Sequence, residues 1–226
     1  MLVAARDYKV KRFIFAASSS TYGDSTELPK VEDRIGKPLS PYALTKYVDE
    51  LYADVFAKTY GIEYIGLRYF NVFGRRQDPN SMYAAVIPLF IKQYLNHRQP
   101  KINGDGQNTR DFTYIDNVLH MNMLALKTTN IQAVNQIYNT AGGERTSINK
   151  LANDIKSYLV QYDSSISYIN PIHGAYRLGD IPHSFACIDK AKQLLDYSPL
   201  VSFQEGLKET IEWYVNRPKS STNQEG

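Results

Sequence analysis

The sequence predicts an α/β protein in which the carboxy-terminal part of a doubly wound parallel sheet precedes a smaller mixed α/β domain. Two apolar runs of strand length, at 12–17 and 62–69, are typical of strands buried on both faces of a parallel sheet. A helical pattern over 41–60 separates them, as in a unit of alternating strands and helices. Shorter elements follow after Asn71, which indicates the second domain.

Local signals set the expected limits of the first elements. Residues 1–9 read as the end of an amphipathic helix, and 18–41 as an irregular loop because Ser, Gly and Pro are frequent there. Over 41–60 the apolar residues recur at spacings of three and four, and Gly61 stands where a helix C-cap is expected.

After Asn71 the predicted elements become shorter. The expected helices are 83–96, 116–128, 147–162 and 203–216, with Thr146 or Ser147 as N-cap of the third, and the expected strands are 100–103, 110–114 and 136–140. We therefore divide the chain into a partial sheet domain at 1–75, a second domain at 76–215 with segments that return to the sheet, and a flexible tail at 216–226.

The composition excludes several classes of function. The 26 basic and 23 acidic residues nearly balance, and no basic stripe with interleaved aromatics predicts nucleic-acid binding. Cys187 is the only cysteine, which excludes an internal disulfide framework and a cysteine zinc site, and we find no metal-ligand pattern. No segment has the h-region of a signal peptide or the roughly 20 apolar residues of a membrane helix. We expect a cytoplasmic protein with no membrane partner.

Tyr42 and Lys46 lie four residues apart on the predicted helix, so both side chains point to one face. A tyrosine is a weak base near neutral pH unless a positive charge stabilises its phenolate, and Lys46 supplies that charge. The same spacing is also common on helices that have no catalytic role.

A serine run, Ser18 to Ser20, directly follows the first predicted strand. This is the carboxyl end of the strand, where open α/β sheets bind their ligands. A hydroxyl there could relay a proton to Tyr42 or hold a substrate hydroxyl beside it. The alternative is a turn in which the serines bond their own backbone.

Five segments, taken in order, resemble one enzyme family. They are AASSSTYGD (16–24), SPYALTK (40–46), LRYFNVFGRRQDP (67–79), INGDGQNTRDFTYIDNV (102–118) and RLGDIPHS (177–184). The chain resembles the carboxy-terminal two thirds of UDP-sugar 4-epimerases, in the NAD-dependent epimerase/dehydratase family of extended short-chain dehydrogenases/reductases, and is most similar to UDP-N-acetylglucosamine 4-epimerases of surface-polysaccharide synthesis. The resemblance implies a Rossmann-like sheet, NAD as cofactor, a UDP-sugar substrate bound largely by the second domain, and a homodimer.

The resemblance also implies roles for the residues near the reaction. Tyr42 would take the proton of the sugar C4 hydroxyl while hydride leaves to NAD, and the 4-keto sugar would rotate and be reduced on its other face. Ser18 or Ser19 would bond the reacting hydroxyl, and the choice between them stays open. Tyr42 and Lys46 would also line the cofactor site, with Lys46 on the nicotinamide ribose and Phe70 beside it.

The second half of the chain matches a clamp for the nucleotide. Arg110 and Arg177 carry planar, always-charged donors suited to a diphosphate, and both match arginines of the family's motifs. Asp180 would bind a ribose hydroxyl or orient the second arginine, and Asn71 would contact phosphate or sugar. The residues that would surround the uridine are Ala85, Val86, Lys101, Ile102 and Asn103.

Ser184 falls where the family has a residue whose bulk limits the sugar pocket. A small side chain there leaves volume for an N-acetyl group, which predicts a preference for UDP-GlcNAc and UDP-GalNAc. We read the neighbouring His183 as an ordinary polar loop residue.

The chain departs from the family pattern in one respect. No G-x-x-G-x-x-G or G-x-G-x-x-G loop, which would hold the NAD pyrophosphate, follows a strand, and the glycines at 104–106 and 142–143 read as turns. We therefore expect an N-terminally truncated chain without the phosphate-binding loop and with an exposed sheet edge. Two hypotheses remain: an epimerase that is active when its amino-terminal part is supplied, or a non-catalytic chain that binds UDP-sugar or dimerises through the Tyr42 helix. A nucleotide-sugar dehydratase or decarboxylase is a further alternative.

Overall fold

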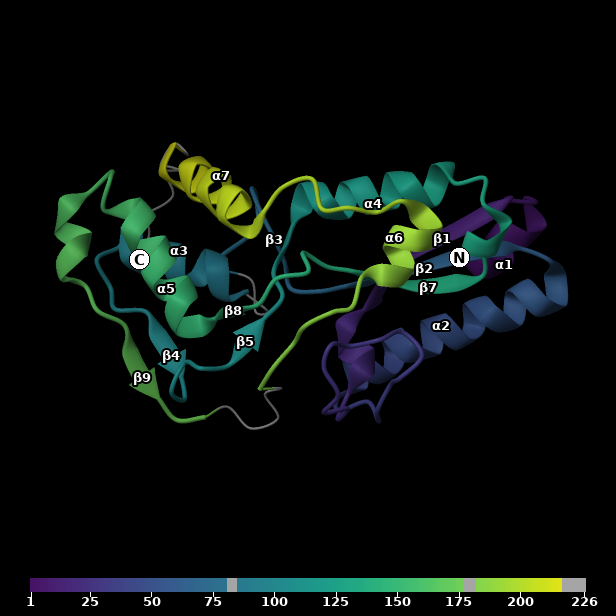
Figure 1. Ribbon diagram of the computed structural model, residues 1–226, viewed down its shortest axis with the longest axis horizontal. Coiled ribbons are helices and arrows are strands. Elements are labelled where there is room, and N and C mark those ends of the chain that lie inside the picture. The colour runs from purple at the N-terminus through teal and green to yellow at the C-terminus, as the bar shows by residue number, and fades with distance from the viewer. Residues whose placement is uncertain (81–84, 177–181, 217–226) are drawn as a thin grey trace, which may run out of the picture.

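Two groups of elements lie side by side in the computed structural model, which describes residues 1–80, 85–176 and 182–216 (Figure 1). One group surrounds a parallel sheet, and the other contains short strands and three helices. Arg177, Asp180 and the predicted tail beyond residue 216 lie outside the described residues.

The sheet contains β1 (Arg12–Ser18), β2 (Glu63–Tyr69) and β7 (Gln136–Thr140), which are parallel and lie in the order β1-β2-β7. The central strand β2 is buried over most of its length, as its apolar run predicted. Helices α2 (Pro41–Tyr60) and α4 (Ile115–Lys127) lie on opposite sides of the sheet (Figure 1). The prediction of a doubly wound α/β fold is therefore confirmed. Within the described residues, no strand pairs with the outer edge of β1.

Helix α2 has the predicted limits, 41–60. The hydroxyl of Ser40 accepts the backbone N–H of Ala43 at 3.1 Å, and Pro41 occupies the first turn, where no N–H is needed. Gly61 ends the helix at φ 71°, a left-handed conformation that costs glycine little, and its N–H bonds the carbonyl of Ala57.

The second group packs around an aromatic centre. The ring of Phe73 lies 5.7 Å from that of Phe203, which stacks on Phe112 at 5.6 Å. The elements of this group are α3 (Val86–Leu95), α5 (Ile148–Leu159), α7 (Phe203–Asn216), the parallel pair β4 (Lys101–Asn103) and β9 (Ile172–Gly174), and the antiparallel pair β5 (Thr109–Arg110) and β8 (Thr146–Ser147).

The remaining elements in the described part of the chain are short. They are α1 (Leu2–Asp7), the 3₁₀ helices η1 (Ser19–Tyr22), η2 (Ile131–Ala133) and η3 (Ser164–Tyr168), the parallel pair β3 (Val72–Phe73) and β6 (Thr113–Tyr114), and α6 (Asp189–Leu195). None of the helices in the described part of the chain is long and apolar enough to cross a bilayer.

The prediction of a single strand at 110–114 is wrong. The segment forms two strands in different sheets, because β5 ends at Arg110 and β6 begins at Thr113. The side chain of Asp111 between them is fully buried. Its carboxylate accepts the backbone N–H groups of Gly142 and Gly143 at 3.0 and 3.2 Å and of Ala186 at 3.3 Å. These distant contacts, rather than local periodicity, break the strand.

A buried ion pair connects α2 to the sheet. Arg68 on β2 donates to both carboxylate oxygens of Glu50 on α2, at 2.8 and 2.7 Å, and both side chains are almost inaccessible to solvent. Arg68 also donates to the carbonyl of Glu32 at 2.8 Å and lies 4.8 Å from the ring centre of Tyr22. Burial by itself would lower the pKa of Arg68, but the Glu50 contacts raise it above the ordinary value. Arg68 is therefore charged in the folded protein.

We expect Glu50→Gln or Arg68→Met to lower the free energy of unfolding by about 3–5 kcal/mol, because each leaves one buried group without its counter-charge. Replacing both residues with apolar side chains should cost less than either single change. Urea denaturation measures the difference. As a control, Asp54→Asn on the same helix removes the exposed pair with Lys58 and should cost less than about 1 kcal/mol. Equal costs for Glu50→Gln and Asp54→Asn would contradict the assignment.

We also expect Asp111 to make stability depend on pH. Burial raises the pKa of Asp111 from 3.8 to about 7, so its contribution to stability is present below about pH 4 and is lost as the pH rises toward 7. The unfolding free energy of the wild type minus that of Asp111→Asn should therefore decrease between pH 4 and pH 7 and level off above. Denaturation at a series of pH values tests this, and a constant difference over that range would refute it.

Candidate active site

A cavity of about 250 Å³ lies at the carboxyl ends of β1 and β2. It collects six of the predicted site residues from separate parts of the chain: Ser18, Ser19, Phe70, Asn71, Arg110 and Ser184. The remaining lining residues are Ser20, Tyr22, Lys30 and His183. We call this space the serine cavity.

A second cavity of about 290 Å³ lies among the elements of the other group. It brings together all five residues that were predicted to surround the uridine. Its apolar wall includes Phe73, Phe90 and Phe112. The full set of lining residues is Asn71, Val72, Phe73, Ala85, Val86, Ile87, Leu89, Phe90, Lys101, Ile102, Asn103, Asn108, Arg110, Phe112 and Ile148. We call this space the α3 cavity.

Asn71 and Arg110 line both cavities, so they stand where the two spaces meet. Asn71 adopts φ 36°, a conformation that asparagine tolerates better than most residues, and its amide donates to the carbonyl of Asp111 at 2.9 Å. The guanidinium of Arg110 donates to the carbonyls of Thr109 and Pro182 at 3.0 and 3.1 Å. The amide and the cation are therefore held in place by backbone groups.

The serine run begins as a capped turn. The Ser18 hydroxyl accepts the N–H and the hydroxyl of Ser20, at 3.1 and 2.9 Å, and starts the 3₁₀ helix η1. The serine run thus forms a local turn and also lines the cavity, although the sequence presented these as alternatives. Ser18 and Ser19 both line the cavity, so their position does not choose between them.

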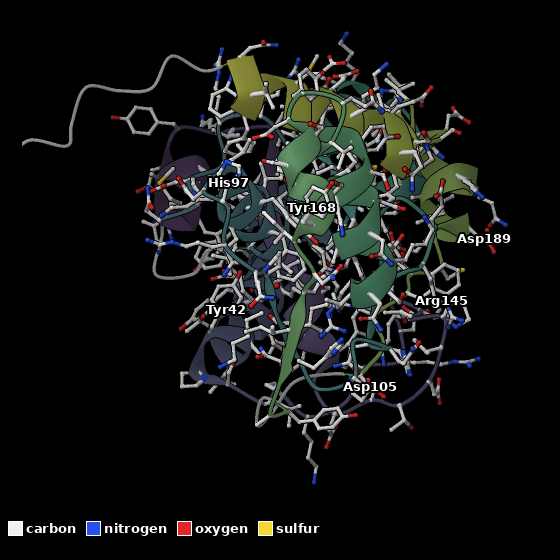
Figure 2. The ribbon with its side chains drawn as sticks, turned by 90° about the vertical axis from the view of Figure 1, so that its left-hand side faces the viewer. Tyr42, His97, Asp105, Arg145, Tyr168 and Asp189 are labelled. Carbon is white, nitrogen blue, oxygen red and sulfur yellow. The ribbon has the colours of Figure 1, made fainter. Side chains whose placement is uncertain are left out.

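The Tyr-Lys pair lies beside the serine run at the surface. The Lys46 amine donates to the carbonyl of Ala16 at 3.0 Å, two residues before Ser18, and lies 3.4 Å from a carboxylate oxygen of Asp49. Tyr42, one turn earlier on α2, is 57% exposed (Figure 2). Neither residue lines the serine cavity within the described part of the chain. Lys46 thus lies next to the strand end that carries the serines, and the Tyr42 side chain is open to solvent.

Tyr22, which lines the serine cavity, belongs to a network of neutral hydrogen bonds. Burial raises the pKa of Tyr22 to about 12, so its phenol is protonated near neutral pH and donates to the side-chain oxygen of Asn139 at 2.6 Å. The Asn139 amide donates in turn to the carbonyls of Lys30 and Cys187, each at 2.9 Å. These bonds hold the loop that carries Lys30 against the segment that contains Cys187.

Sequence reasoning missed several lining residues. Ser20 belongs to the serine run described above, but Lys30 lies in a loop without a local signal. His183, which we read as an ordinary loop residue, lines the cavity with its Nδ1 2.9 Å from the Thr109 hydroxyl. Pairing of residues 182–184 with Thr109 decides this placement, and no local pattern predicts it.

Comparisons with known proteins agree with this architecture. The chain is 37% identical over 221 residues to a putative UDP-glucose 4-epimerase of Methanocaldococcus jannaschii, covering 97% of this chain and 68% of that protein. It is 34% identical over 215 residues to a UDP-glucuronate 4-epimerase of Thermodesulfobacterium geofontis, covering 94% and 62%. The chain thus spans about two thirds of the length of these relatives.

Solved structures show the same similarity. A UDP-N-acetylglucosamine 4-epimerase from Methanobrevibacter ruminantium M1, in complex with UDP-N-acetylmuramic acid, matches with a TM-score of 0.86 and 39% identity over 94% of this chain and 66% of that chain. A UDP-glucuronic acid 4-epimerase from Bacillus cereus, bound to UDP-glucuronic acid and NAD, matches with a TM-score of 0.83 and 33% identity over 94% and 64%. The sequence model of the NAD dependent epimerase/dehydratase family matches residues 1–141. As the motifs predicted, this chain belongs to the NAD-dependent epimerase/dehydratase family.

Proposed function

We propose that this chain carries the substrate site and the proton-transfer residues of an NAD-dependent UDP-hexose 4-epimerase that interconverts UDP-GlcNAc and UDP-GalNAc. The observation that carries this proposal is the pair of cavities that meet at Asn71 and Arg110. In this assignment the α3 cavity takes the uridine, Arg110 binds the diphosphate, and the serine cavity takes the hexose. Similarity to enzymes named as UDP-glucose, UDP-glucuronate and UDP-N-acetylglucosamine 4-epimerases supports this chemistry.

The nucleotide assignment follows from the character of the two spaces. The α3 cavity combines aromatic walls with the side chains of Lys101, Asn103 and Asn108, which suits a flat base with polar edges. A guanidinium at its junction with the serine cavity suits the two phosphates that join base and sugar in a UDP-hexose. Arg177 and Asp180 remain proposed partners of the nucleotide.

The residues present fit one end of NAD. Lys46 and Tyr42 lie on an open surface beside the end of β1, where they would hold the nicotinamide ribose, with Phe70 at the cavity wall. The proposal assigns none of the described residues to the NAD pyrophosphate. When bound, NAD accepts hydride from C4 and returns it.

The side chains of this chain supply the proton transfer. The Tyr42 phenolate takes the proton of the C4 hydroxyl, and the Lys46 ammonium, one turn along α2, stabilises the negative charge on the phenol oxygen. Ser18 or Ser19 bonds the same hydroxyl and keeps it in line for the transfer. The 4-keto sugar then rotates within the serine cavity, and Tyr42 returns the proton after reduction on the other face.

The preference for N-acetylated hexoses follows from Ser184. Its short side chain lies in the wall of the serine cavity and leaves room for a substituent larger than a hydroxyl. A tyrosine at this position would fill that room.

The nucleotide assignment predicts that Arg110→Met weakens UDP-GlcNAc binding by about 10- to 100-fold, because one charged donor to the diphosphate is lost. Isothermal titration calorimetry of the purified chain measures this. Arg75→Met is the matched control, because Arg75 pairs with Asp116 at 2.8 Å and lines neither cavity. Absence of UDP-GlcNAc binding to the wild type would refute the proposed site.

The catalytic assignment is tested in the same titrations by adding NAD and following UDP-GalNAc formation. Tyr42→Phe should reduce turnover by about 100-fold or more while leaving the Kd for UDP-GlcNAc nearly unchanged. UDP-GlcNAc binding without NAD binding or turnover by the wild type would favour the alternative function, a chain that binds UDP-sugar without catalysis.

We further propose that the chain forms a homodimer through α2. Leu44, Leu51 and Val55 are spaced by seven and four residues, share one face of the helix, and are 53%, 48% and 54% exposed. Leu51→Lys combined with Val55→Lys should halve the mass measured by light scattering. Leu126→Lys, at an exposed apolar position on α4, should leave that mass unchanged, and a monomeric wild type would refute the proposal.

A further inference from the structure

The serine cavity contains a lysine for which the proposed mechanism has no role. Lys30 lies in the loop between η1 and α2, is 4% exposed, and lines the cavity together with the serines and Ser184. Lysine is rarely buried to this degree unless an anion or a set of acceptors surrounds its amine.

The described residues give the buried Lys30 amine few hydrogen-bond acceptors and no counter-charge. Its ammonium donates to the carbonyl of Ser25, which uses one of its three N–H donors. Within residues 1–80, 85–176 and 182–216, no carboxylate forms an ion pair with it, and none of the residues that line the serine cavity is acidic. Burial lowers the pKa of Lys30, and the distant charge of Glu27 opposes that effect only in part. The position therefore favours a ligand that brings a hydrogen-bond acceptor.

Backbone pairing places Lys30 beside the segment that carries Ser184. The N–H of Lys30 donates to the carbonyl of Phe185 at 2.7 Å, and its carbonyl accepts the N–H of Cys187 at 2.9 Å. The Asn139 amide bonds the same carbonyl of Lys30. Lys30 is thus paired with Ala186, two residues from Ser184, and both Lys30 and Ser184 line the serine cavity. The space that Ser184 leaves open and the donors of Lys30 therefore belong to neighbouring parts of one wall.

We propose that Lys30 determines substrate specificity by donating a hydrogen bond to the carbonyl oxygen of an acetamido group on the hexose, which occupies the space beside Ser184. This inference rests on the proposed UDP-hexose site. An acetamido carbonyl extends further from the sugar ring than a hydroxyl and acts only as an acceptor. Ser184 therefore selects the hexose substituent by its size, and Lys30 selects it by its ability to accept a hydrogen bond.

The test compares the binding of UDP-GlcNAc, UDP-glucose and UDP-glucuronate to the wild type and to Lys30→Met by calorimetry. Methionine retains the unbranched length of the side chain but has no donor. The ratio of the Kd for UDP-GlcNAc to the Kd for UDP-glucose should rise by about tenfold or more in Lys30→Met. Lys30→Gln, which restores an N–H donor, should recover part of the loss.

Ser184→Tyr provides a second and independent arm. Because the tyrosine fills the acetamido space, it should raise the same Kd ratio, and adding Lys30→Met to it should change the ratio little further. This non-additivity separates a shared contact from a general weakening of the fold.

Other outcomes overturn the inference. A selective loss of UDP-glucuronate binding in Lys30→Met would mean that the amine meets a carboxylate, and an equal loss for all three ligands would mean a purely structural role. If the wild type binds UDP-GlcNAc and Lys30→Met leaves the ratio unchanged, the inference fails while the proposed function stands. If the wild type binds none of the three, both fail.

Discussion

The buried pair between Arg68 and Glu50 sets the geometry on which the rest of the site depends. Its two hydrogen bonds, at 2.8 and 2.7 Å, join β2 to α2 in an environment from which water is excluded. Sliding or rotating α2 would separate two desolvated charges, which is far more costly than separating a surface pair. The position of the Tyr42-Lys46 turn relative to the strand ends is therefore tied to this contact, and the reach of Lys46 to the carbonyl of Ala16 follows from it.

Asp111 positions the segments around the two cavities, as the Arg68–Glu50 pair positions α2. Its carboxylate gathers the loop after β7 and the segment that contains Ala186, while its own backbone carbonyl holds the amide of Asn71. Because Arg110 is the preceding residue, the guanidinium at the junction of the two cavities is fixed by the same contacts. One buried carboxyl thus aligns the serine cavity with the α3 cavity, at the cost of desolvating that carboxyl.

The serine cavity follows the general geometry of open α/β sheets, in which ligands bind at the carboxyl ends of the strands. Ser18 ends β1, Asn71 lies just after β2, and the glycines that bond Asp111 lie just after β7. Parallel strands end at the same side of a sheet, so residues that are far apart in the chain meet there. The chemistry proposed for the site therefore needs the sheet itself and not only the Tyr-Lys helix.

The sequence alone determined the elements whose causes are local. Apolar spacing over 41–60 and Gly61 predicted the limits of α2, and continuous apolar runs predicted the buried strands, because capping and burial act over a few residues. The ordered motifs also sufficed to identify the family and to propose about half of the residues that line the two cavities.

Only the tertiary structure decided the features that depend on distant contacts. The break of the strand at Asp111 arises from hydrogen bonds to residues 31 to 75 positions away, which periodicity within a segment does not contain. Lys30 has no local signal in the sequence. It lines the serine cavity because its backbone pairs with Phe185 and Cys187. Side-chain burial at such positions is set by chain segments that meet only after folding, and so no local pattern predicts it.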